Sequence, residues 1–308
     1  MKILLFGYSS LAIRKIIPAL EKLDFVISFD CASLSKNIPK NCYKKLDVIY
    51  NSYQNAIKNS DADFIYISTA NNKHAELIKL SLNHNKNIIV DKPAVLDLDD
   101  AKILFDLANK KKKIIIEAIT YKFHPQIDYI KKYSTQINQI TVNFSVPGFE
   151  ITNFRYNNEL GGGVVYDMAP YAIDIGKTIF KSNPMYFYGK LFKNDVYSRM
   201  NIIIEFEKNK IVNGYFGFES EYVNSGIFLG NDIFLSSDRL FTSDSSKDST
   251  ILMRKKNISK DINFNPSDSF INFFRNLLEL NKKDFKKINS VFLQQATDMS
   301  NLMKEINK

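Results

Sequence analysis

The sequence predicts an α/β amino-terminal Rossmann domain with a doubly wound parallel sheet, followed by an α+β domain with an open-faced, mostly antiparallel sheet. Residues 1 to about 125 alternate short apolar runs with amphipathic helical patterns, which is typical of a parallel sheet covered on both faces. Later runs alternate apolar and polar residues, which is typical of strands with one buried face. A length of 308 residues suits two domains, and we expect them at 1–122 and 123–308.

In the first half, each expected strand is a short apolar run, and helical patterns with apolar residues near the 3.6 period separate them. The expected strands are Ile3–Phe6, Phe25–Phe29, Phe64–Ile67, Asn87–Val90 and Ile114–Ile116. The expected helices are Leu11–Leu20, His74–Leu82 and Asp99–Ala108.

In the second half, strands dominate and few helices lie between them, so we expect mostly antiparallel pairing. The expected strands are Ile140–Val146, Met185–Leu191, Asn201–Glu207, Ile211–Glu219 and Ile227–Leu235. One helix is expected early, at Val164–Ile179, and others close the chain at Ser267–Leu280 and Val291–Ile306.

The net charge of +9 raises the question of an anionic partner. Only six of the 42 basic residues are arginine, the residue preferred for bidentate recognition of phosphates and bases, and the lysines are scattered along the chain. We therefore expect no nucleic-acid partner and favour an anionic small molecule.

The few metal-ligating residue types follow none of the zinc spacings, because the chain has two cysteines, Cys31 and Cys42, and three histidines. We expect no metal. No apolar run approaches the roughly 18 residues of a membrane span, and the first run ends at Gly7, too early for a signal peptide. The expectation is a cytoplasmic protein with no membrane partner.

The first candidate for chemistry is the turn from Gly7 to Ala12, where the first strand meets the first helix. A dinucleotide fingerprint, G-x-G-x-x-G/A, holds a pyrophosphate there on backbone amides. Gly7 and Ala12 match it, and Ser9 replaces the middle glycine. A serine hydroxyl could itself donate to phosphate, so we assign Gly7, Ser9, Ser10 and Leu11 to the cofactor.

Two further candidates follow the third and fourth strands, at the edge where open α/β sheets bind ligands. They are Thr69, Asn71 and His74, and then Asp91, Lys92 and Pro93. The ribose contact depends on where the second strand ends. If it ends at Asp30, that carboxylate binds a 2′-hydroxyl and favours NAD; if it continues to Ala32, Ser33 faces the ribose and no basic residue clamps a 2′-phosphate. NAD is favoured slightly over NADP.

The remaining candidates lie near the start of the second half. Tyr121 and His124 follow the fifth strand, and Arg155 precedes three glycines that allow close backbone approach before a helix. On that helix Asp167 and Tyr171 are four residues apart and share one face.

Taken in order, these segments resemble the Gfo/Idh/MocA family of NAD(P)-dependent oxidoreductases over residues 1–180. The matching segments are Gly7–Ala12, Thr69–His74, Asp91–Pro93, Tyr121–Pro125 and Gly161–Tyr171. The family pattern has glycine at Ser9, glutamate at Asp91 and histidine at Tyr171. Tyrosine at that last position is similar to the glucose–fructose oxidoreductase, dihydrodiol dehydrogenase and sugar 3-ketoreductase branches.

The resemblance implies an active site in which Lys92 polarises a hydroxyl or carbonyl, Tyr171 exchanges the proton, and Asp167 contacts or orients the substrate. Tyr121, His124 and Arg155 would line the substrate site. The expected function is hydride transfer between a nicotinamide and a sugar or nucleotide-sugar carbon, possible settings being deoxysugar or surface-polysaccharide biosynthesis. Two alternatives stay open: a non-catalytic nucleotide or sugar sensor, and a dehydrogenase of a dihydrodiol or tetrapyrrole.

Self-association is also expected, because an antiparallel sheet covered on one side leaves its other face open. Ile202 and Tyr215 would then contribute to an apolar interface. A homodimer or a higher homo-oligomer is the predicted assembly.

Overall fold

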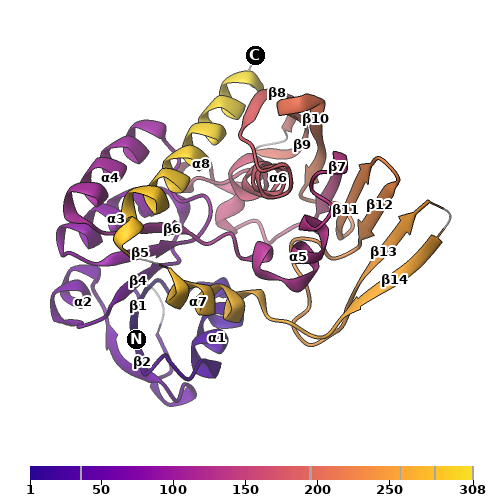
Figure 1. Ribbon diagram of the computed structural model, residues 1–308. Coiled ribbons are helices and arrows are strands. Elements are labelled where there is room, and N and C mark those ends of the chain that lie inside the picture. Colours follow the sequence, from indigo (N-terminus) through magenta and orange to yellow (C-terminus); the bar gives the residue numbers. More distant parts are fainter. Residues whose placement is uncertain (35–36, 194–195, 257, 281, 307–308) are drawn as a thin grey trace. The chain divides into compact units, whose positions relative to one another are not determined.

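The computed structural model of the protein describes residues 1–34, 37–193, 196–256, 258–280 and 282–306 (Figure 1). The chain divides into two compact units. The first combines Met1–Ala118 with Phe273–Ala296, and the second combines Ile119–Asn272 with the residues from Thr297 on. The division falls at residue 118 where 122 was expected, and the return of Phe273–Ala296 to the first unit was not expected.

The first unit contains a parallel sheet of six strands in the order β3-β2-β1-β4-β5-β6. The strands are β1 Lys2–Phe6, β2 Ser28–Ala32, β3 Leu46–Tyr50, β4 Phe64–Ile67, β5 Asn87–Val90 and β6 Ile115–Glu117. The order reverses between β1 and β4, and dinucleotides bind at the carboxyl ends of the strands beside such a switch point. The doubly wound parallel sheet is confirmed.

Helices connect the strands of this unit, and two of them begin at side-chain caps. Ser52 caps α2 and Asp97 caps α4 by accepting backbone N–H groups of the first turn. The helical segments among the strands are η1 Ala12–Ile16 (a π-helix), α1 Ile17–Lys22, η2 Lys40–Cys42, α2 Tyr53–Asn59, η3 Asn71–Lys73, α3 His74–Asn83 and α4 Leu98–Lys111. Near the end of the chain follow α7 Ser269–Glu279, η8 Lys282–Asp284 and α8 Phe285–Ile306, which belong to this unit only within Phe273–Ala296.

The second strand lies three residues later than expected, and β3 was missed. Asp30 is a charged residue within the apolar run of β2, so the expected strand stopped before it. In the structure its carboxylate is fully buried and the strand continues to Ala32. β3 has no fully buried residue, since it is the edge strand of the sheet. An edge strand lacks the continuous apolar run that marks the central strands.

The segment Phe273–Ala296 belongs to the first unit because it completes that unit's core and satisfies its backbone. The ring of Phe274 lies 6.0 Å from that of Tyr66, and Phe292 is buried in the apolar cluster around β1, β4 and β5. Asn289 Oδ1 accepts the Ile115 N–H at 2.9 Å, and its Nδ2 donates to the Lys113 carbonyl at 2.9 Å.

The second unit contains an eight-stranded sheet in the order β14-β13-β12-β11-β7-β10-β9-β8, and only the β7–β10 pair is parallel among its described pairings. The strands are β7 Ile137–Ser145, β8 Pro184–Lys193, β9 Tyr197–Phe206, β10 Lys210–Gly217, β11 Val223–Gly230, β12 Ile233–Ser237, β13 Ser249–Lys255 and β14 Ile258–Phe264. The mostly antiparallel sheet is confirmed. The single strand expected at 227–235 is instead the hairpin of β11 and β12, and β13 and β14 were missed.

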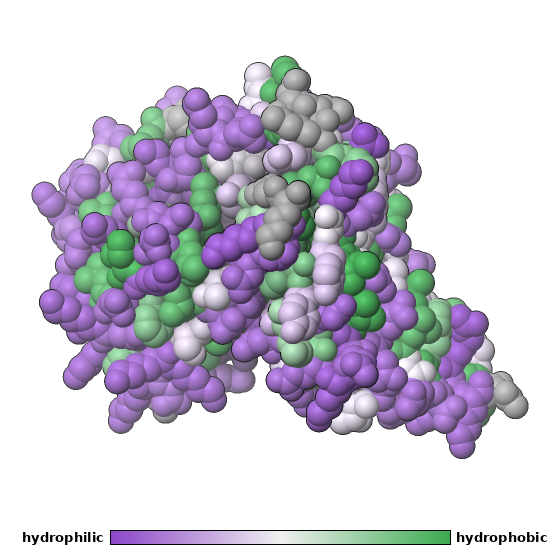
Figure 2. All heavy atoms as spheres, turned by 90° about the horizontal axis from the view of Figure 1, so that it is seen from above, coloured by the Kyte–Doolittle hydropathy of each residue, from purple (hydrophilic) through white to green (hydrophobic). Residues whose placement is uncertain are grey.

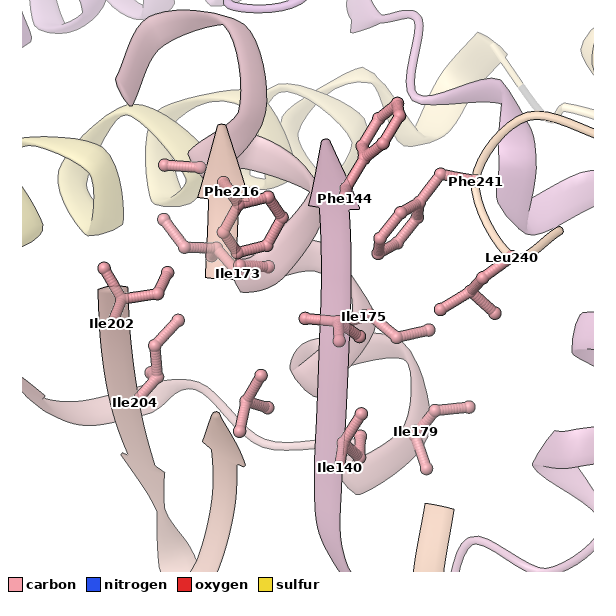
Figure 3. Packing of buried hydrophobic residues seen from close by; sticks show 14 of the residues in the cluster. Ile140, Phe144, Ile173, Ile175, Ile179, Ile202, Ile204, Phe216, Leu240 and Phe241 are labelled. Atoms are coloured by element: carbon pink, nitrogen blue, oxygen red, sulfur yellow. The ribbon is translucent and has the colours of Figure 1, made fainter. Parts of the chain in front are cut away.

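The helix α6, Val164–Phe180, packs on one face of this sheet. Its isoleucines meet apolar side chains of β7, β9 and β10, and Phe144 lies beside Phe241 (Figure 3). The shorter helical segments of the unit are η4 Thr120–Phe123, α5 Pro125–Lys131, η5 Phe154–Tyr156, η6 Asn158–Leu160 and η7 Glu207–Asn209.

On the face drawn in Figure 2, hydrophilic side chains predominate and apolar ones form smaller patches among them. Among the helices of the described residues, none has the length and apolar character that crossing a membrane requires.

Candidate active site

The turn after β1 lies against the end of β4, and only glycine fits at its first position. Gly7 has φ +97°, and a Cβ there would lie 2.2 Å from the Ser68 carbonyl oxygen. The Gly7 N–H donates to the Ala32 carbonyl at 2.9 Å, so the turn also follows the end of β2. The helix that follows begins at Ser10, which is exposed, and Leu11 is half-buried. This is the geometry by which such a turn admits a pyrophosphate.

Three hydroxyl groups and one carboxylate connect this turn to the ends of β4 and β5. The Ser9 and Ser68 hydroxyl oxygens are 2.7 Å apart, and the Ser68 hydroxyl donates to Asp91 Oδ2 at 2.6 Å. The Tyr66 hydroxyl donates to the other oxygen of Asp91 at 2.9 Å. The parallel register pairs Ile67 with Val90, which places Ser68 beside Asp91.

The loop that carries Lys92 is anchored at both of its sides. Before Lys92, Asp91 is held by the two hydroxyl groups just described; after it, the Pro93 carbonyl accepts from His74 Nδ1 at 2.9 Å. The Ala94 N–H donates to Glu117 Oε1 at 3.0 Å. The Lys92–Pro93 peptide is cis, and Lys92 itself is half-buried. The sequence motif therefore gives a lysine on a fixed backbone at the carboxyl edge of the sheet.

His74 joins two of the expected cofactor loops and does not face solvent. It is fully buried, and burial lowers its pKa to about 4, so the neutral ring predominates at neutral pH. The shorter contact, to Pro93, takes the Nδ1 proton, while Nε2 lies 3.3 Å from the Thr69 carbonyl. The expected role of His74 as a cofactor ligand is therefore replaced by a structural one.

Asp30 is not a ribose ligand. The carboxylate is fully buried and accepts from Ser60 Oγ at 2.6 Å and from the Val48 N–H at 3.2 Å, and Lys2 Nζ lies 3.3 Å away. Its hydrogen-bonding capacity therefore serves the junction of β2 and β3. Because β2 continues to Ala32, Ser33 takes the position after the strand, half-buried.

The other two residues expected at the cofactor lie just after β4. The Thr69 hydroxyl is directed to the neighbouring Ala70 carbonyl at 3.4 Å, and Asn71 is 7% exposed in η3. They share the carboxyl edge with Asp91 and Lys92, as the parallel topology predicts.

In the second unit, Tyr171 is a half-buried residue of α6 whose ring is held by three aromatic neighbours. The centroid distances are 5.0 Å to Phe241, 5.7 Å to Phe144 and 5.9 Å to Tyr121. Such contacts fix the ring plane and hence the direction of the phenolic oxygen.

Asp167, one turn earlier on the same helix, forms an ion pair with Arg155. Arg155 Nε donates to Asp167 Oδ2 at 2.9 Å and Nη2 to Oδ1 at 3.4 Å. The guanidinium carbon also lies 4.8 Å from the ring centroids of Phe149 and Phe154. These contacts orient the guanidinium between two rings and one carboxylate.

The run of three glycines explains how Arg155 and Asp167 meet. The N–H groups of Gly162 and Gly163 donate to the carbonyls of Asn157 and Arg155, at 2.9 and 2.8 Å. A Cβ at Gly162 would lie within 2.5 to 2.7 Å of three carbonyl oxygens of that loop. Only a chain without side chains can pack so closely and lead directly into α6.

Two expected substrate residues are instead structural. Tyr121 is 2% exposed, and its hydroxyl donates to Asp174 at 2.8 Å. His124 is also 2% exposed; its Nδ1 accepts the Gln126 N–H at 3.3 Å, which caps α5, and burial lowers its pKa. Asp174, which also binds Lys122 at 3.1 Å, was missed, although it lies three residues after Tyr171 on the same helix face.

The structure therefore brings the candidates together in two groups. Asp91, Lys92 and Pro93 lie with Ser9 and Ser68 in the first unit; Asp167, Tyr171 and Arg155 lie in the second. Among the residues that the structure describes, no cluster of histidine, cysteine and carboxylate side chains could hold a metal ion.

Comparison with known proteins supports the same reading of the fold. Residues 2–119 match the model of the GFO_IDH_MocA family, described as an oxidoreductase family with an NAD-binding Rossmann fold. The chain is 24% identical to a dTDP-3,4-didehydro-2,6-dideoxy-α-D-glucose 3-reductase of Actinomadura kijaniata, over 77% of this chain and 74% of the relative. It is 22% identical to the enzyme of that name from Saccharopolyspora spinosa, over 87% of this chain and 83% of the relative.

Solved structures show the likeness over nearly the whole chain. A 3-ketoreductase from Actinomadura kijaniata, in complex with NADP and TDP-benzene, superposes with a TM-score of 0.89 at 20% identity, covering 99% of this chain and 97% of its own. An aldose–aldose oxidoreductase from Caulobacter crescentus gives a TM-score of 0.85 at 14% identity, covering 100% of this chain and 97% of its own. Residues 2–119 therefore match the Gfo/Idh/MocA family of oxidoreductases with an NAD-binding Rossmann fold, and the solved structures show that the likeness in fold extends over the whole chain.

Proposed function

We propose that the protein is an NAD(P)-dependent oxidoreductase that transfers a hydride between nicotinamide and a ketone or hydroxyl carbon of a nucleotide-linked sugar. The observation that carries the proposal is the anchored loop of Lys92, placed at the carboxyl edge of the parallel sheet beside a dinucleotide turn. The substrate class rests on the relatives, two of which reduce a dTDP-linked keto sugar.

The residues of the first unit fit a dinucleotide. The close approach of Gly7 to β4, the exposed Ser10 at the helix start and the switch point between β1 and β4 provide a turn for the pyrophosphate. When bound, the nicotinamide supplies or accepts the hydride. Thr69, Asn71 and the Asp91–Pro93 loop would line its path along the same edge.

The proposed reaction assigns a role to one residue of each unit, Lys92 and Tyr171. The ammonium of Lys92 polarises the carbonyl, and the Tyr171 phenol provides the proton for the developing alkoxide. Asp167 would act through Arg155, because its carboxylate orients that guanidinium toward an anionic substrate.

We favour NADP as the cofactor. The carboxylate that argued for NAD, Asp30, is buried and engaged, and the residue after β2 is the neutral Ser33. That register offers no basic residue at Ser33 for a 2′-phosphate, so the preference rests on the solved 3-ketoreductase of the same fold, which is in complex with NADP. Titration with NADPH and NADH, followed by nicotinamide fluorescence, tests this choice, and tighter binding of NADH would contradict it.

The proposed function is tested by following nicotinamide absorbance with a panel of substrates. We expect the purified protein to oxidise NADPH in the presence of a dTDP-linked keto sugar and not with the free sugar alone. If neither NADPH nor NADH binds at millimolar concentration, the proposed function is wrong. Binding without turnover of any sugar or nucleotide sugar would favour the sensor alternative.

We also propose that the protein self-associates through the face of the second sheet that points away from α6. On that face Tyr186, Tyr188 and Ile203 are 55%, 50% and 40% exposed. A groove of about 460 Å³ runs over it, with Tyr188, Ile203 and the half-buried Tyr215 in its lining. Ile202, expected there, is buried at 2% exposure and was wrongly placed. Exposed apolar patches of this kind commonly mark interfaces between copies.

A further inference from the structure

Two positions at which this chain departs from the family pattern, Ser9 and Asp91, are joined through the hydroxyl of Ser68. We propose that Ser9 is a positioning residue that holds Asp91, and with it the loop of Lys92, and that its hydroxyl is not a ligand of the cofactor's pyrophosphate. This inference rests on the proposed function, because it concerns how the cofactor turn and Lys92 are coupled.

The direction of each hydrogen bond follows from the number of hydrogens present. An ionised carboxylate only accepts, so Ser68 must donate its one hydroxyl hydrogen to Asp91 at 2.6 Å. The Ser68 oxygen can therefore only accept in its 2.7 Å contact with Ser9. Ser9 must then donate its own hydrogen to Ser68. That leaves no hydrogen on Ser9 for a phosphate oxygen.

The acceptor side of Ser9 is also engaged. Its oxygen accepts the Ala12 N–H at 3.0 Å, which takes one N–H group of the first helical turn away from an anion as well. A serine in this state fills the space of the family's glycine and offers the pyrophosphate no hydrogen-bond donor from its side chain.

Ser10, the next residue, supplies a matched comparison. It is exposed at the start of the helix, and its hydroxyl forms no hydrogen bond with any described residue. The same residue type thus occurs twice in one turn, once linked to Asp91 and once open to solvent. A phosphate contact from a side chain in this turn is assigned to Ser10.

The link reaches Lys92 because Asp91 precedes it directly. The loop is fixed at Asp91, at Pro93 through His74 and at Ala94 through Glu117. Loss of the Ser9 hydrogen bond loosens the first of these three anchors and leaves the other two intact. A small displacement of Lys92 then lowers the rate of the chemical step more than it lowers cofactor affinity.

The test compares Ser9→Ala with Ser10→Ala in the full chain, measuring the Kd for NADPH by nicotinamide fluorescence and kcat with a dTDP-linked keto sugar. Ser9→Ala should change Kd by less than about 2-fold and lower kcat by about 10-fold or more. Ser10→Ala should raise Kd by about 10-fold, the loss expected for one hydrogen bond to a charged group. Ser9→Thr keeps the hydroxyl and should restore most of kcat. Melting temperatures show that each variant is folded.

Asp91→Asn distinguishes a connected network from separate contacts. An amide can donate to Ser68 and so reverse both hydrogen bonds, which removes the constraint that Ser9 satisfies. Ser9→Ala should therefore add little to the kcat loss of Asp91→Asn, whereas Ser10→Ala should combine additively with it. A rise in Kd for Ser9→Ala equal to that for Ser10→Ala, or additive effects of Ser9→Ala and Asp91→Asn, would overturn the inference alone. Failure of the unmodified protein to bind NADPH would overturn the proposed function and, with it, this inference.

Discussion

Aromatic contacts hold the ring of Tyr171. Phe241, Phe144 and Tyr121 surround its ring at 5.0 to 5.9 Å, so the ring cannot turn without disturbing all three. Phenylalanine at this position would keep these ring contacts and remove the hydroxyl group.

We therefore predict that Tyr171→Phe lowers turnover by about 10²–10⁴-fold, the usual range for general acid–base catalysis. The Kd for NADPH should stay within about 2-fold, since the hydroxyl is assigned to the substrate side. Steady-state kinetics and fluorescence titration measure the two quantities. Lys92→Ala should be at least as damaging, and near-normal turnover in Tyr171→Phe would assign the proton to another group.

A second prediction at this scale concerns His74. Its pKa of about 4 in the folded protein lies below the value of about 6.5 for an unperturbed histidine, so the unfolded chain binds more protons between these values. The contribution of His74 to the free energy of unfolding is therefore complete above about pH 6.5 and is lost as the pH falls to about 4. Its size is of the order of 3 kcal/mol.

Urea unfolding between pH 4 and 7 measures this dependence. His74→Gln keeps an N–H for the Pro93 carbonyl but does not titrate, so its free energy of unfolding should vary less with pH over that window. An identical pH dependence in the variant would show that other groups cause it.

Which site residues the sequence can predict depends on how locally their environment is determined. Ser68 and Asp91 could have been paired in advance, because they follow Ile67 and Val90, which are neighbours in the parallel register. Phe241 offers no such signal, because it comes from a loop far along the chain. The burial of Asp30 could not be predicted either, since its partner Ser60 lies in the loop after another helix.

At the scale of elements, the same distinction separates the strands. Central strands buried on both faces were located from their apolar runs, whereas β3 at the sheet edge, the half-buried β13 and the exposed β14 were not. β14 has no buried residue, so hydrophobic periodicity contains little information about it. The ends of β2 and the turn between β11 and β12 depend on contacts with neighbouring strands.

The start of α6 gives a prediction for an element. Ala at Gly162 would place a Cβ within 2.5 to 2.7 Å of the carbonyl oxygens of Phe154, Arg155 and Asn157, so the loop must move away. We expect Gly162→Ala to lower the free energy of unfolding by about 1–3 kcal/mol, as overpacking does elsewhere. Activity should fall further because Arg155 is displaced from Asp167.

Gly148→Ala is the matched control, because its Cβ would meet its nearest neighbours at 3.5 and 3.6 Å, which is ordinary contact. Chemical denaturation of both variants gives the comparison. Equal stability of the two would show that the loop accommodates a side chain at Gly162.

For the whole molecule, the outer face of the second sheet predicts a dimer or a larger assembly. Light scattering at micromolar concentration should give at least twice the chain mass of 35.5 kDa. Tyr188→Glu puts a charge in the groove and should shift the mass toward one chain without unfolding the protein. Ile103→Glu, at an apolar position exposed on α4, should leave the mass unchanged. A monomeric unmodified protein would contradict the proposal.

The discontinuous first unit has a consequence for biosynthesis. Its sheet is complete at residue 117, yet Phe274, Asn289 and Phe292, which seal that sheet, are translated more than 150 residues later. Domains usually fold in order as they leave the ribosome. Here the core around the nascent Rossmann sheet is not completed until nearly the entire polypeptide has emerged. Until then the Ile115 N–H lacks its acceptor, Asn289 Oδ1. Chaperone engagement during this interval is therefore expected, and ribosome-bound chains stalled before residue 273 should be more sensitive to protease than chains stalled after the full sequence has cleared the exit tunnel.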